Sequence, residues 1–423
     1  MKVSAHRAFA LLKELAYERV SCSEAEKRAA ERLLEVASST GAETHIEEFA
    51  VKCGRVKHAK LVVTSPYVKE YECTGYERAL PTPEGGLDGE FYYAENVLPA
   101  HLDNAKGKIV MVNGRLGMKA YEKLQKAGVA AILTFDGTTL DRRSETDCDI
   151  RKLRETLTDA HGACVALHLR TADAVEIVRR GAKTMHIELE AEDYEGTSRN
   201  VCAVIKGTQK PDEIISLGAH FDSVYFSTGV YDNMSGSVIL MELLRYFSEQ
   251  KPDRTLKFNW YGSEEQGLLG SKAWTKAHEE ELDKHVLMIN VDVAAPILGQ
   301  NAAPVLATEK VVGYVDAMMR EAGIPCDVRL DIYSSDCIPF ADKGVPAINL
   351  CRFGTAGANY IHDRRDNLRS GYISADALDV TLQQTLLLTE RVANAKVFPI
   401  ERKVADEIVK KVDEYLFKKP EKK

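Results

Sequence analysis

The sequence predicts an α/β protein whose main sheet is covered by helices on both faces, a three-layer α/β/α sandwich. From residue 198 onward, continuous apolar runs alternate with amphipathic segments. Apolar strands that lack a polar side are typical of a sheet buried on both faces. The expected strands are 200–205, 213–217, 255–261, 285–291 and 345–350, and the expected helices are 235–249, 269–282, 310–322, 375–394 and 401–416.

The first 55 residues and the segment 56–195 have different textures. Two helices are expected early, around 8–15 and from the Ser23-to-Glu26 capping pattern to Gly41, followed by a strand at 44–51. The segment 56–195 has short strand-like runs separated by turns rich in proline and glycine. Its expected strands are 60–64, 108–113, 130–135 and 184–189, and its expected helices are 118–126 and 171–180. We therefore expect residues 1–55 and 196–423 to form a catalytic domain, with 56–195 as an inserted domain.

Composition excludes several classes of protein. Of the 423 residues, 45% are hydrophobic and 28% are charged, which excludes a mainly disordered chain. The net charge of 56 − 64 = −8 offers no field that would gather nucleic acid. No apolar run reaches the roughly 18–20 residues that cross a bilayer. Lys13, Glu14, Glu18 and Arg19 interrupt the N-terminal apolar stretch, and the nine cysteines form no CxxC pair. These features predict a soluble cytoplasmic protein with reduced thiols and with neither nucleic acid nor membrane as a partner.

Acidic residues and histidines follow the apolar strands of the second half in five short stretches. Because open α/β sheets bind ligands at the carboxyl ends of their strands, we expect these stretches to converge on one edge. They lie at 218–223 (GAHFDS), 231–236 (YDNMSG), 261–267 (YGSEEQG), 290–292 (NVD) and 360–363 (YIHD).

Together these stretches supply the ligands of a metal centre. Two imidazoles and three carboxylates suit zinc, with cobalt or manganese as substitutes. Five side chains are too many for one tetrahedral zinc, and they suit two ions that share a carboxylate. Two divalent ions, three carboxylates and one hydroxide would also form a neutral cluster, which lowers the cost of burying it. The candidate ligands are His220, Asp232, Glu265, Asp292 and His362.

Two further carboxylates lie beside these ligands. Adjacent side chains diverge, so one of Glu264 and Glu265 can bind a metal while the other faces the attacking water as a general base. Asp222 comes two residues after His220, close enough to orient its ring through the second nitrogen.

The motifs resemble those of the co-catalytic di-zinc aminopeptidases, a family that includes glutamate carboxypeptidase II-like enzymes. The resemblance rests on HFDS, YDNMSG, GSEEQGLLGS, NVDVA, SSDCIPFADKGVPAINL and YIHDRRDNL. It implies a mixed central sheet of the zinc-peptidase type and two zinc ions. Asp232 would bridge them, with Glu265 and His362 on one ion and His220 and Asp292 on the other. Glu264 would be the general base and Asp222 would orient a ligand.

The resemblance carries further expectations and some departures. It implies a cis peptide bond between Asp232 and Asn233, and a protease-associated domain as the insertion. Tyr360 would stabilise the oxyanion, although Ile361 separates it from His362, where many members have tyrosine directly before this histidine. Cys337 stands where the family has a histidine, and members with this insertion are often secreted.

The predicted function is zinc-dependent removal of N-terminal residues from peptides, through a water molecule that bridges the metals. One alternative is a carboxypeptidase or dipeptidase, for which Arg352, Arg364 or Arg365 would bind the terminal carboxylate. Surface pairing of these arginines with Asp363 and Asp366 is the favoured interpretation. A glutaminyl-cyclase-like transferase uses similar ligands. A non-catalytic binding protein is disfavoured because all five ligands and the base are present.

Overall fold

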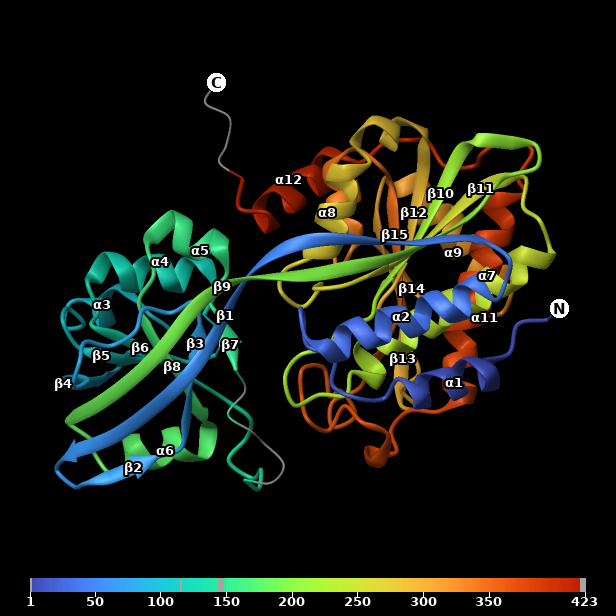
Figure 1. The fold of residues 1–423 in the computed structure, drawn as a ribbon. Coiled ribbons are helices and arrows are strands. Elements are labelled where there is room, and N and C mark those ends of the chain that lie inside the picture. Colours follow the sequence, from blue (N-terminus) through green and yellow to red (C-terminus); the bar gives the residue numbers. More distant parts are fainter. Residues whose placement is uncertain (1, 115, 144–147, 149, 419–423) are drawn as a thin grey trace. The chain divides into compact units, whose positions relative to one another are not determined.

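The computed structural model describes residues 2–114, 116–143, 148 and 150–418. The chain forms two compact units, Met1–Ala50 with Thr197–Lys423, and Val51–Gly196. Two long paired strands, β1 (Glu43–Ser65) and β9 (Thr184–Ile205), carry the chain between the units (Figure 1). The sequence predicted two separate strands within each of them. That was wrong, because the exposed polar stretches between the apolar runs stay in the backbone ladder, which does not require burial.

The sheet of the first unit is mixed. Its strands follow the order β14-β13-β15-β12-β10-β11-β9, in which β10 pairs in parallel with β11 and β12, and β12 with β15. The β11–β9 and β13–β15 pairs are antiparallel. The strands are β10 (Lys210–His220), β11 (Arg254–Tyr261), β12 (His285–Val291), β13 (Gly299–Leu306), β14 (Asp327–Leu330) and β15 (Ala347–Gly354).

Helices cover both faces of this sheet. Leu287, Ile289 and Val291 of β12 pack into one hydrophobic cluster and Met288 into another, as the alternation of side chains along a strand requires. The first cluster includes α1 (Ala5–Glu14), α2 (Glu24–Ser38), α7 (Ser235–Glu249), α9 (Glu309–Glu321) and α11 (Ala375–Ala393). The second includes α8 (Leu269–Ala277), α10 (Cys337–Asp342) and α12 (Asp406–Tyr415). The predicted three-layer α/β/α fold with a mixed sheet is confirmed.

The second unit has its own sheet and core. Its strands follow the order β9-β4-β5-β6-β8-β3-β7, and β2 pairs with β1. A separate cluster of buried residues includes Ile109, Ile132 and Leu167 from neighbouring strands. The elements are β2 (Lys69–Tyr71), β3 (Cys73–Glu77), β4 (Leu87–Tyr93), α3 (Pro99–Leu102), β5 (Ile109–Met111), α4 (Met118–Ala127), β6 (Ala131–Asp136), β7 (Arg151–Lys152), α5 (Glu155–His161), β8 (Val165–Arg170) and α6 (Thr171–Arg179). Its identity as a protease-associated domain stays a prediction.

Two sequence expectations concern the whole chain. Within the described residues, none of the helices is both long enough and apolar enough to cross a bilayer. The nine cysteines all lie within the described residues and form no disulfide, and six of them are buried.

Candidate metal centre

The five predicted ligands lie at the carboxyl ends of the parallel strands. His220 is the last residue of β10, and Asp292 directly follows β12. Glu265 comes shortly after β11, and His362 lies beyond the end of β15. Asp232 lies in the turn that leads into α7, and its peptide bond to Asn233 is cis, as the resemblance implied. Residues that are far apart in the sequence therefore meet at one edge of the sheet.

The five side chains form two groups that share Asp232. One contains His220, Asp232 and Asp292, and the other Asp232, Glu265 and His362. The Oδ1 atom of Asp232 lies 3.1 Å from Nε2 of His220, while its Oδ2 atom lies 3.3 Å from Nε2 of His362. In the first group Nε2 of His220 lies 3.6 Å from Asp292, and in the second Nε2 of His362 lies 2.8 Å from Glu265. Asp232 thus presents one oxygen to each group, as a bridging ligand would.

Asp222 positions the two glutamates. Its carboxylate accepts hydrogen bonds from the backbone N–H of Glu264 at 3.0 Å and of Glu265 at 3.2 Å. Its Oδ1 atom also lies 3.4 Å from Nδ1 of His220, the nitrogen that faces away from the ligand group. The Glu264 carboxylate reaches to within 3.8 Å of Nε2 of His220, whereas Glu265 contacts His362. The two adjacent side chains therefore diverge, as expected.

The electrostatics of the centre indicate an excess of buried negative charge. Burial raises the pKa of Glu264 well above its usual range, and the neighbouring Glu265 adds to that effect. Burial would lower the pKa of His220, but four nearby carboxylates, Glu264 first among them, raise it well above its usual range. The side-chain oxygen Oε1 of Glu265 is buried and has no hydrogen-bond partner. Imidazole and carboxylate donors with such a charge excess fit divalent zinc, which would neutralise them.

Two residues that sequence reasoning missed hold this geometry. Asp366 is fully buried, and it accepts hydrogen bonds from the backbone N–H of Tyr231 at 2.9 Å and of Asp232 at 3.1 Å. The expectation that Asp366 pairs with an arginine at the surface was wrong, because its carboxylate takes up these buried donors. The side chain of Asn233 donates to the carbonyl of Val291 and accepts from the N–H of Val293. It therefore binds the backbone on both sides of Asp292.

Arg19 is a third such residue. It is fully buried, and its guanidinium donates to the carbonyls of Phe221, Thr228 and Gly229 as well as to those of Leu15 and Tyr17. These bonds fix the loop between His220 and Asp232. The only signal in the sequence is that Arg19 is a charged residue within an apolar stretch. Such a charge does not indicate which groups the side chain will contact.

Tyr360 and Arg352, which the sequence also singled out, form hydrogen bonds with residues outside the two ligand groups. The Tyr360 hydroxyl donates to the carbonyl of Gly357 at 3.1 Å, and its ring packs against Tyr372. Arg352 donates to the carbonyl of Pro296 and to the side chain of Asn301.

Three further residues, Arg365, Cys337 and Tyr333, differ in their burial and their partners. Arg365 is paired with Asp363 at 2.6 Å, as the favoured interpretation expected. Cys337 is fully buried at the start of α10. A phenol that the sequence did not single out, Tyr333, is half-buried, and burial together with the charge of Asp292 raises its pKa.

Comparison with known families agrees with this geometry. Residues 200–389 match peptidase family M28. The M28 segment contains all of the candidate ligands, the two glutamates and Asp222, so the predicted family resemblance is confirmed.

The chain is similar to carboxypeptidases and to aminopeptidases. Carboxypeptidase Q of Mus musculus is 24% identical over 59% of this chain and 56% of its own length. Aminopeptidase YwaD of Bacillus subtilis is 24% identical over 64% of this chain and 59% of its own length. The matches thus span less than two thirds of these relatives.

Solved structures match nearly the whole chain. BSAP, a zinc aminopeptidase from Bacillus subtilis, has a TM-score of 0.77 and 21% identity over 96% of this chain and 99% of its own. A peptidase M28 precursor from Shewanella amazonensis has a TM-score of 0.77 and 25% identity over 95% of each chain. Both units of the chain are therefore included in these matches.

Proposed function

We infer that this protein is a zinc-dependent exopeptidase that removes N-terminal residues from peptides. The observation that carries the proposal is the placement of Asp232, whose two oxygens face separate groups of imidazole and carboxylate donors. His220 and Asp292 would hold one zinc ion, and Glu265 and His362 the other. Such a pair polarises the scissile carbonyl and makes water a nucleophile at neutral pH. Cobalt or manganese could replace zinc with the same ligands.

Glu264 is the general base of this proposal. Its carboxylate is buried at the edge of the first ligand group, and Asp222 fixes its backbone. A base in this place takes a proton from the attacking water and delivers it to the leaving amine.

Tyr360 is the proposed donor to the oxyanion. Catalytic hydrogen bonds often form only in the substrate complex, so its present bond to Gly357 would be exchanged for one to the substrate.

The carboxypeptidase alternative needs a cation that faces the substrate. Arg352 and Arg365 are engaged with backbone carbonyls, Asn301 and Asp363. The match to carboxypeptidase Q keeps this alternative open to test. The non-catalytic alternative is disfavoured, because the five candidate ligands and Glu264 lie together.

A pair of matched peptides tests the proposal. The zinc-loaded protein is incubated with a dipeptide that has a free amine and with its N-acetylated counterpart, and free amino acids are measured. We expect release only from the free amine. Cleavage of the acetylated peptide alone would indicate a carboxypeptidase. Loss of the substrate without free amino acid would indicate a cyclase, and no reaction with zinc bound would indicate a binding protein.

The proposal also includes a protease-associated domain as the insertion and a cytoplasmic location. Val51–Gly196 has its own core and, in the sequence, interrupts the catalytic unit, and both features support a protease-associated domain. A cytoplasmic location would be tested by cell fractionation.

A further inference from the structure

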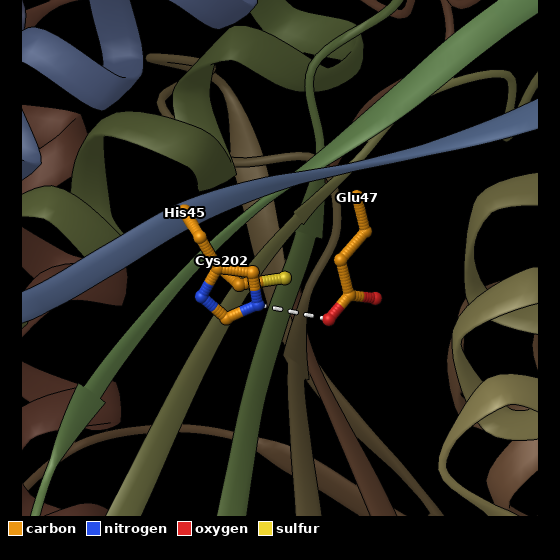
Figure 2. Close-up of side chains that lie close together, drawn as sticks. All are labelled: His45, Glu47 and Cys202. Atoms are coloured by element: carbon orange, nitrogen blue, oxygen red, sulfur yellow. Dashed lines mark hydrogen bonds and ion pairs between the residues drawn. The ribbon is translucent and has the colours of Figure 1, made fainter.

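A second group of metal-binding side chains lies on β1 and β9, apart from the five ligands above. One nitrogen of His45, one oxygen of Glu47 and the sulfur of Cys202 all lie within 4.8 Å of one another (Figure 2). His45 and Glu47 are two residues apart on β1, so their side chains share one side of that strand. Cys202 reaches them from the paired strand β9.

The Glu47 carboxylate is the centre of this group. Its Oε1 atom lies 2.9 Å from Nε2 of His45 and 2.8 Å from Nε2 of His278, which follows α8. Burial opposes ionisation of Glu47, but the bonds from His278 and His45 outweigh it and lower the pKa. The Cys202 sulfur is buried beside this carboxylate.

His278 is oriented as metal-bound histidines are. Its second ring nitrogen, Nδ1, lies 3.1 Å from the carboxylate of Glu281, and Trp274 stacks on the ring at 4.4 Å between centroids. A carboxylate behind the ring fixes the tautomer and leaves Nε2 to face the ligand group. Lys257, a cation whose charge acts on His278 and Cys202, is paired with Glu281, which compensates it on that side.

We propose that His45, Glu47 and Cys202 bind a structural zinc ion, with His278 as the fourth ligand. Imidazole, carboxylate and thiolate are all zinc ligands, at distances of about 2.0–2.3 Å, and four of them complete a tetrahedral site. The donors of His45, Glu47 and Cys202 already lie within 4.8 Å of one another, and His278 adjoins them through its contact with Glu47. One thiolate and one carboxylate also balance the charge of a divalent ion, which matters beside the buried Cys202.

Such an ion would cross-link three segments of the catalytic unit. It would join β1 to β9 and to the end of α8, three segments that are distant in the sequence. The thiol of Cys202 would lose its proton on binding, although burial and the charge of Glu47 hold its pKa well above the usual range without a cation.

Cobalt substitution tests this site independently of peptidase activity. Chelator-treated protein is titrated with Co²⁺ while the near-ultraviolet absorption is recorded, because a cobalt–thiolate bond gives a charge-transfer band there. The ligands of the proposed catalytic centre are nitrogen and oxygen only, so the band reports Cys202. We expect the band in the unmodified protein and in Cys326→Ser, a matched control thiol outside the group. We expect it to be absent in Cys202→Ser and reduced in His45→Gln.

Elemental analysis provides the second readout. After zinc loading and dialysis, Cys202→Ser should hold one zinc fewer per chain than Cys326→Ser, with unchanged circular dichroism. His45 is half-exposed, so His45→Gln gives the same comparison without altering the core. A missing thiolate band in the unmodified protein, or a band that persists in Cys202→Ser, would overturn the proposal. In that case the group is a carboxylate held between two imidazoles without a metal.

Discussion

The backbone N–H of Asp232 donates a hydrogen bond to the buried carboxylate of Asp366 at 3.1 Å. The residue that faces both ligand groups is therefore held from behind by a second carboxylate. The same carboxylate also accepts from Tyr231 and from the hydroxyl of Tyr372, at 2.9 and 2.8 Å. Asp222 plays the equivalent part for Glu264 and Glu265. Each side of the centre thus has one aspartate whose task is to hold backbone.

Asp366→Asn tests this support. The amide retains one acceptor oxygen, so at least one backbone N–H near Asp232 loses its partner and faces a second donor. We expect zinc retention after dialysis, or turnover, to fall by about 10–100-fold, the usual cost of removing a residue that supports a ligand. Tyr372→Phe is the matched control, since it removes one donor to Asp366 without touching the bonds to residues 231 and 232. Equal losses in both variants would refute the positioning role.

Much of this architecture could be predicted from the sequence, but the contacts that hold the candidate metal centre in place could not. The bounds of β12 and α7 were predicted correctly because a continuous apolar run and a clear amphipathic stretch define them locally. β13 was missed because its run of alanines and Pro304 is untypical of a strand. The helix expected from 401 begins only at Asp406, since Arg402 is drawn to the carbonyls of Leu282 and His285.

The same distinction holds at the centre. That five stretches would gather could be predicted, because each one comes near the end of an apolar strand, and the structure brings them together. Their roles as ligands and base stay predictions. Asp366, Asn233 and Arg19 act through backbone groups of segments distant in the sequence, and such partners become visible only in the folded chain. Nothing in their local sequence distinguishes them from surface polar residues.

The contribution of Glu26 to stability should fall as the pH rises from 5 to 8. Its carboxyl is fully buried, and burial raises its pKa to about 8, above the roughly 4.3 of an unfolded chain. A carboxyl with a raised folded pKa binds its proton more tightly in the native state, so its contribution is present at low pH and lost as the pH rises. Glu26→Gln should reduce the pH dependence of the unfolding free energy by about 3 kcal/mol over this interval.

Urea unfolding at pH 5 and at pH 8 measures that difference. Glu24→Gln on the first turn of α2 is the control, since this side chain is exposed. The unfolding free energy of Glu26→Gln could instead show the same pH dependence as that of the unmodified protein. The Glu26 carboxylate would then be ionised at both pH 5 and pH 8, with its charge compensated by Arg199 at 3.4 Å.

The two tyrosines near the centre should differ in their effect on catalysis. If the Tyr360 hydroxyl stabilises the oxyanion, Tyr360→Phe should lower kcat by about 10²-fold, the order found when one such donor is removed, with little change in KM. Tyr333→Phe is the comparison, because that phenol lies in the field of Asp292 and is held against Phe353. A larger kcat loss in Tyr333→Phe would transfer the role to Tyr333.

The neighbouring glutamates should separate turnover from metal binding. Glu264 lies at the edge of the His220 group, while Glu265 is 2.8 Å from Nε2 of His362. Glu264→Gln should therefore retain both zinc ions and lose about 10²–10⁴-fold in kcat, the contribution of a general base. Glu265→Gln should instead release the ion shared with His362, and added zinc should restore part of the activity. Metal analysis of the dialysed proteins, combined with kinetics at increasing zinc, distinguishes the two effects. Asp222 bonds the backbone of both residues, so neither substitution disturbs that support and each result reports the side chain alone. Loss of zinc from Glu264→Gln with a full complement in Glu265→Gln would reverse the assignment, because one residue cannot both occupy a ligand position and carry the proton.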